Sequence, residues 1–186
     1  TINNLSASAQ VGLGFKDLSG SAGTMGTLTV GLADETGASD TITLNAFEVT
    51  SATLKATAIE TVNVAYSTTG TGLQNTALTV SALNAGAIVV TGSDADTGHT
   101  LTLGTLDTDT SSVTSSGYKG ILTALSGSAA NVTYNLDGTN VNTITGSTGN
   151  DIVTIGSTTA TQVIDGGTAG EDSLTMTLGG TVVGTG

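Results

Sequence analysis

Two glycine- and aspartate-rich stretches late in the chain carry the residue types best suited to binding a cation. They are 146–154 (Gly-Ser-Thr-Gly-Asn-Asp-Ile-Val-Thr) and 166–174 (Gly-Gly-Thr-Ala-Gly-Glu-Asp-Ser-Leu). The first fits the nonapeptide Gly-Gly-x-Gly-x-Asp-x-apolar-x except at Ser147, and the second has one extra residue before Gly170. Glycine lets the backbone turn its carbonyls inward through φ > 0. Carbonyl and carboxylate oxygens are the ligands that Ca²⁺ prefers, so the pattern predicts calcium binding.

The predicted calcium site draws its oxygens from both stretches. Asp151 and Asp172 are the primary candidate ligands, and Asn150 and Asp165 are secondary candidates on the same loops. One loop cannot complete a shell of about six to eight ligands, so the two loops must stack. Their 20-residue offset is about one turn of a small β-solenoid. The glycines expected to give carbonyls or permissive turns are Gly146, Gly149, Gly166 and Gly170. The alternative is that these glycines only form tight turns, which the aspartates cap by local hydrogen bonds.

Further acidic residues form weaker candidate sites. Two Asp-x-Asp pairs could each chelate a cation, because alternate residues of a strand share one face. These lower-ranked metal candidates are Asp94, Asp96, Asp107 and Asp109. Solvated turn carboxylates are the alternative interpretation for them. Asp34, Asp40 and Asp137 are interpreted as turn-forming residues, with metal binding as the less favoured alternative.

The elements that must position these loops are short strands of alternating polar and apolar residues, such as 27–30, 41–44 and 61–66. Turn-forming residues separate them at intervals that suit a β-sandwich or a β-solenoid. Gly127, Gly146 and Gly166 recur at offsets of 19 and 20 residues, which favours the solenoid. We therefore predict an all-β fold, a right-handed parallel β-solenoid or β-roll at least in the C-terminal half, with a β-sandwich as the alternative.

The domain organisation follows from the same pattern. Glycines interrupt any periodicity in residues 1–25, which are expected to be irregular or to cap the open end of a solenoid. Residues 26–186 are expected to form one strand-rich domain. It has a candidate seam at the polar loop 67–75 and carries the calcium loops at 146–174.

The composition excludes several classes of partner. Three Lys+Arg stand against fifteen Asp+Glu, giving a formal net charge of −12, and arginine is absent. Binding to nucleic acid needs basic side chains that displace counterions from phosphate, so no nucleic-acid partner is expected. No apolar run approaches the roughly 18 residues of a transmembrane helix, so no membrane insertion is expected. The absence of cysteine rules out disulfides and thiolate chemistry.

Catalysis is not expected from this sequence. His99 is the single histidine, and no Gly-x-Ser-x-Gly element accompanies it. Paired aspartates could serve as acid and base in glycoside hydrolysis. Sugar sites usually also use aromatic platforms, however, and the three tyrosines are scattered singly.

The two nonapeptides resemble the glycine-aspartate repeats of RTX-type secreted proteins. The chain also resembles calcium-dependent surface-layer (S-layer) proteins of Gram-negative bacteria in its runs 33–44 and 59–64 and in its composition, which is rich in Thr, Ala, Gly and Asn. The resemblance implies a structural, non-enzymatic fragment of an extracellular surface protein that folds and self-assembles with Ca²⁺. Its implied partners are further copies of itself and surface polysaccharide or lipopolysaccharide. Long RTX arrays have many tandem copies, whereas this chain has two imperfect ones. The alternative is an RTX-type adhesin, or a calcium-binding repeat module of a larger secreted enzyme.

Overall fold

The computed structural model shows an all-β chain, as the sequence predicts. It describes residues 1–6, 10–14, 23–34, 36–47, 49–56, 58–67, 75–81, 86–92, 100–106, 109–115, 118, 120–125, 131–139, 142–146 and 148–179. Its described strands form two sheets of eight. The odd-numbered sheet contains β1 (Ile2–Leu5), β3 (Gly23–Leu32), β5 (Val49–Ala56), β7 (Asn75–Ser81), β9 (Thr100–Thr105), β11 (Ile121–Leu125), β13 (Asn142–Thr145) and β15 (Gln162–Asp165). The even-numbered sheet contains β2 (Gln10–Gly14), β4 (Thr41–Phe47), β6 (Thr61–Ser67), β8 (Ala87–Gly92), β10 (Ser112–Thr114), β12 (Thr133–Leu136), β14 (Ile152–Thr158) and β16 (Ser173–Leu178).

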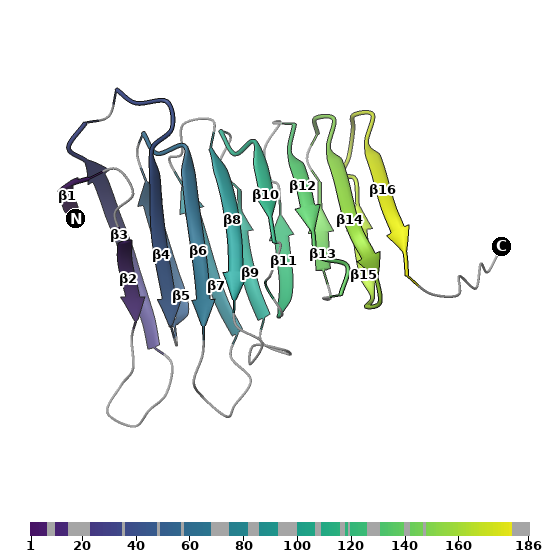
Figure 1. Cartoon of the computed structure of the whole chain (residues 1–186), viewed down its shortest axis with the longest axis horizontal. Helices are drawn as coiled ribbons and strands as arrows, with labels where there is room; N and C mark the ends of the chain where they lie inside the picture. The colour runs from purple at the N-terminus through teal and green to yellow at the C-terminus, as the bar shows by residue number, and fades with distance from the viewer. Residues whose placement is uncertain are drawn as a thin grey trace.

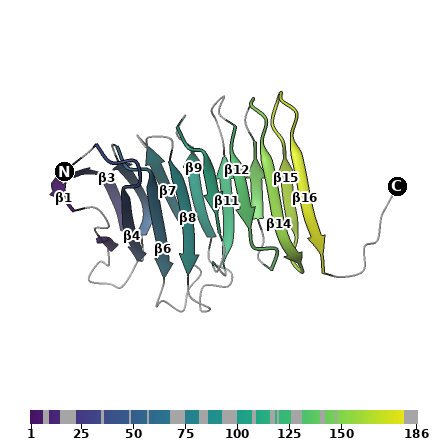
Figure 2. The same cartoon turned by 45° about the horizontal axis from the view of Figure 1, so that its top comes forward.

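The chain alternates between the two sheets, so that each coil contributes one strand to each. Every described strand pair within a sheet is parallel, as in β6 with β8 and β13 with β15. The coils follow one another along the long axis of the molecule, from β1 and β2 at one end to β15 and β16 at the other (Figures 1 and 2). This topology confirms the predicted parallel β-solenoid and extends it beyond the C-terminal half. It does not fit the β-sandwich alternative, whose sheets are antiparallel.

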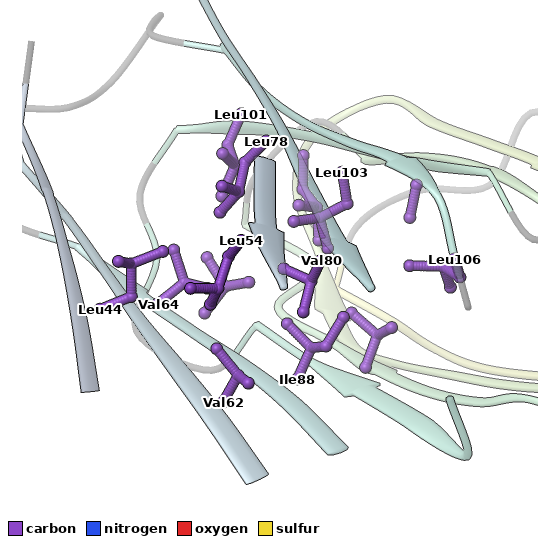
Figure 3. Packing of buried hydrophobic residues seen from close by; sticks show 14 of the residues in the cluster. Leu44, Leu54, Val62, Val64, Leu78, Val80, Ile88, Leu101, Leu103 and Leu106 are labelled. Carbon is purple, nitrogen blue, oxygen red and sulfur yellow. The ribbon is translucent and has the colours of Figure 1, made fainter. Parts of the chain in front are cut away.

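The core lies between the two sheets and consists of inward-facing, mainly aliphatic rows (Figure 3), together with the buried Tyr118 and Tyr134. In the even-numbered sheet, Ile42, Val62, Ile88 and Val113 stack in register from coil to coil and are fully buried. The strand neighbours of Ile42, Val62 and Val113 are Thr, Ser or Asn, which face outward because side chains alternate across a strand; those of Ile88 are Ala87 and Val89. Burying one such aliphatic side chain stabilises the fold by about 1.5–3 kcal/mol. Repeated stacking therefore compensates for the scarcity of aromatic residues.

Two features add to the sequence-based expectation. The segment 1–25, expected to be irregular or capping, contributes β1 and β2, the end strands of the two described sheets, which pair in parallel with β3 and β4. The coils also vary in length. The register offset is 26 residues from Val62 to Ile88 but 19 residues from Tyr134 to Val153. Residues 68–74, in the candidate seam at 67–75, lie outside the described residues.

Candidate metal centre

The predicted calcium loops lie where the chain enters the even-numbered strands. We call the residues immediately before β4, β6, β8, β10, β12, β14 and β16 the entry corner. Thr133, Ile152 and Ser173 pair across β12, β14 and β16. The residues just before them, Asp151 and Asp172 among them, are therefore successive members of one row. The two aspartates predicted as primary ligands thus lie on adjacent coils, as a shared site requires.

Each of these aspartates binds the backbone of the preceding coil. Val132 N donates to Asp151 Oδ1 at 2.8 Å, and Asp151 N donates to Asp172 Oδ1 at 2.9 Å. The Asp151 side chain is 1% exposed. The alternative of purely local turn capping is wrong for both residues, because their bonds cross from one coil to another. Asp165 does cap locally: its Oδ1 accepts a hydrogen bond from Gly167 N at 3.0 Å.

Asparagines one position earlier form a second row of inter-coil bonds in the opposite sense. Asn150 N donates to Asn131 Oδ1, and Glu171 N donates to Asn150 Oδ1, each at 2.8 Å. Asn131 is therefore the counterpart of Asn150 on the preceding coil, although the spacing in the sequence suggested that it corresponds to Asp151. Asn150, predicted as a secondary calcium ligand, uses its side-chain oxygen to hold the next coil. The adjacent polar pair Asn150-Asp151 was the sequence signal for this double row.

Glycines line the inner side of the aspartate row. A Cβ added at Gly146 would lie 2.6 Å from Asp151 Oδ2 and would also clash with the carbonyl of Gly166. A Cβ added at Gly166 would clash with Asp172 Oδ2. Gly170 has φ near +101° and packs against the carbonyl of Gly149. These close approaches explain why the predicted glycines are needed at these positions.

A cavity of about 160 Å³ brings together most of the predicted site. Its lining includes the three aspartates Asp151, Asp165 and Asp172 and the two glycines Gly146 and Gly166. Gly149, Asn150 and Gly170 are not among its lining residues. They belong to the neighbouring backbone contacts of the corner.

The three carboxylates of this cavity are ligands that suit Ca²⁺, although Val153, Ile164 and Leu174 also line it. A carboxylate offers about four lone-pair sites, so Asp151 and Asp172 can each accept an N–H and still ligate a cation. Within the described ranges, no group of three or more His, Asp or Glu side chains is arranged to hold a metal. Backbone carbonyls and water would therefore complete a calcium shell here.

The other acidic candidates divide into two groups. Asp94, Asp96 and Asp107, like His99, lie outside the described residues. Asp109 is exposed, and its carbonyl accepts a hydrogen bond from Gly86 N.

Asp34 and Asp137 form the predicted turns. Each Oδ1 accepts bonds from the backbone N and the hydroxyl of a threonine two residues later. The Thr36 hydroxyl, and then its N–H, lower the pKa of Asp34. Both residues therefore stabilise local turns, as the sequence predicted.

Comparison with protein-family models, curated proteins and solved structures gave no match to this chain. Over the described residues, no helix is long and apolar enough to cross a membrane. The fold and the entry corner are therefore the observations on which a function can be proposed.

Proposed function

We propose that this chain is a structural segment of a secreted bacterial surface layer, and that Ca²⁺ bound at 146–172 fastens its coils together. The observation that carries the proposal is the pairing of Asp151 and Asp172 on adjacent coils around a glycine-lined cavity. The single lysine among the described residues, Lys55, lies exposed on β5 in the other sheet. A divalent cation is therefore the natural counter-charge for these carboxylates.

The expected stabilisation follows from mass action. Extracellular calcium modules bind with Kd of about 10⁻⁴–10⁻³ M. Binding to the folded state alone then contributes about 1–2.3 kcal/mol per site at about 5 mM Ca²⁺. For a domain of this size that corresponds to a rise in Tm of about 2–9 °C. Without calcium, repulsion between the acidic loops would leave this corner less stable.

The test is thermal unfolding followed by circular dichroism in EGTA, in CaCl₂ and in MgCl₂. We expect Tm to rise with CaCl₂ and to change little with MgCl₂, because Mg²⁺ dehydrates reluctantly. Asp151→Asn should remove most of the calcium-dependent rise, because it removes a charged ligand while keeping an oxygen for Val132 N. Asp137→Asn is the matched control, since Asp137 caps a turn and does not line the cavity. An identical Tm in EGTA and CaCl₂ would contradict calcium binding.

The surface-layer part of the proposal concerns assembly. Among the described strands, β15 and β16 are the last of the two sheets, and Val163 and Leu174 on them are 52% and 51% exposed. Exposed strand edges with apolar side chains favour association with further chains. Electron microscopy with CaCl₂ should show ordered sheets of the protein. A protein that stays monomeric and binds a glycan would instead favour the adhesin alternative.

A further inference from the structure

The entry corner carries a second pair of carboxylates in the N-terminal half of the solenoid. Asp40 and Glu60 precede β4 and β6, whose first residues, Thr41 and Thr61, pair in register. Asp40 N donates to Glu60 Oε2 at 2.8 Å. This bond repeats the one between Asp151 N and the Asp172 carboxylate. The same device therefore links adjacent coils at two separate places along the corner.

The Asp40 carboxylate is nearly buried and has an unsatisfied oxygen. The residue is 8% exposed, and Oδ2 has no hydrogen-bond partner. A Cβ added at Gly37 would lie 2.6 Å from Oδ2 and 2.8 Å from Oδ1, so the carboxylate packs directly on that glycine. The same packing of carboxylate on glycine occurs between Asp151 and Gly146 and between Asp172 and Gly166. The sequence interpretation of Asp40 as a turn-forming residue does not account for it.

An unsatisfied buried carboxylate oxygen is costly and requires an explanation. A proton, an ordered water or a bound cation could each satisfy it. The adjacent Glu60 carboxylate adds negative charge at the same place, which favours a cation over a neutral water. Both carboxylates offer hard oxygen ligands, the type that Ca²⁺ prefers.

We propose that Asp40 and Glu60 bind a divalent cation, Ca²⁺, at a second site on the entry corner. No third acidic side chain joins them within the described residues, so backbone carbonyls and water complete the shell. The site rests on its own residues and not on the cavity at 146–172. It fastens the coils of β4 and β6 as the first site fastens those of β14 and β16.

The test is calorimetric titration of the whole chain with CaCl₂, and with MgCl₂ for comparison. Asp151→Asn/Asp172→Asn should still bind one equivalent of Ca²⁺, and adding Asp40→Asn should abolish that equivalent. Glu60→Gln keeps an acceptor for Asp40 N and should weaken this binding about tenfold or more, for loss of one charged ligand. Circular dichroism checks that each variant is folded.

Alanine substitutions at Gly37 and Gly26 test whether binding depends on the position of the Asp40 carboxylate. Gly37→Ala should displace the carboxylate and weaken binding, whereas Gly26→Ala should not, because its Cβ would meet nothing within 4 Å. Unchanged calcium stoichiometry in Asp40→Asn would overturn the proposal, and the carboxylate would then be satisfied by a proton or water. If Asp151→Asn/Asp172→Asn instead binds as many equivalents of Ca²⁺ as the unsubstituted chain, the proposed site at 146–172 is contradicted, and the site at Asp40 and Glu60 is not.

Discussion

At the scale of single residues, Asp151 combines two roles. One carboxylate oxygen satisfies the buried N–H of Val132, and the other packs on Gly146, which lines the cavity with Asp151. The first role holds whether or not a cation is bound, because an unsatisfied buried donor costs about 1–3 kcal/mol. The second makes Asp151 a candidate ligand in the calcium site that we propose. The aspartate of the nonapeptide is therefore structural and a candidate ligand at once.

The glycines of the corner should tolerate substitution very unequally. Gly146→Ala should destabilise the fold by about 1–3 kcal/mol, because its Cβ would clash with the Gly166 carbonyl and the Asp151 carboxylate. Gly156→Ala should be neutral or stabilising by up to about 1 kcal/mol, since its nearest contacts would be 3.8 Å away. Urea unfolding in EGTA measures both variants without interference from calcium. Equal stability of the two would show that the close approach at Gly146 relaxes freely.

At the scale of strands, the inward row of the odd-numbered sheet contains an amide pair. Asn142 follows Leu101 and Leu122 in register and is buried, and Gln162 follows it. Asn142 Nδ2 donates to Gln162 Oε1 at 2.7 Å and to the Asp137 carbonyl at 2.9 Å. Gln162 Nε2 reaches the Ala160 carbonyl at 3.2 Å. The amides thus continue a leucine row into the last coils, where they bond to each other and to backbone carbonyls.

This amide pair should behave as a coupled unit. Asn142→Leu should destabilise the fold by about 1–3 kcal/mol, because it removes the hydrogen-bond partner of the Gln162 side chain. Asn142→Leu/Gln162→Leu should cost less than the sum of the two single changes, with a coupling of about 0.5–3 kcal/mol. Urea unfolding of the unsubstituted chain, the two single variants and the double variant measures this coupling energy. Strict additivity would mean that the two amides do not stabilise one another.

At the scale of the whole molecule, each coil contacts only its neighbours, so stability depends on position along the solenoid. β6 pairs with both β4 and β8, whereas β16 pairs with β14 alone among the described strands. The inward residue Val153 on β14 is 5% exposed, but its neighbour Leu174 on β16 is 51% exposed. The last described coil therefore buries less apolar surface and is expected to be less stable than the inner coils.

Native-state hydrogen exchange should reveal this gradient. Amides of β16 should exchange faster than those of β6 and β8, because fewer contacts oppose local opening. CaCl₂ should slow exchange at residues 146–172, which surround the candidate cavity. Mass spectrometry of peptides can follow both effects in one experiment. Uniform exchange along the chain would contradict nearest-neighbour stability and indicate a single cooperative unit.

The sequence was sufficient for the fold class, and it selected loops that the structure brings together around one cavity. Alternation in segments such as 41–44 and 61–66 is a local property of strands, so it predicts the inward rows directly. The glycine and aspartate spacing identified the loops that line the cavity, because their turn and ligand chemistry is also local. Within 1–25, β1 and β2 form the end strands of the two described sheets, since backbone pairing with β3 and β4 does not require the side-chain periodicity that glycines interrupt.

Only the tertiary structure decided which residues meet across coils. Coil lengths vary from 19 residues between Tyr134 and Val153 to 33 between Gln10 and Thr43, so a fixed repeat cannot set the register. The match of Asn131 with Asn150, and the bond between Asp40 N and Glu60, both depend on that register. Loop length is weakly constrained because closing a longer loop adds little free energy. Strand pairing and the packed core between the sheets set the register instead, which is why the inter-coil contacts had to be observed.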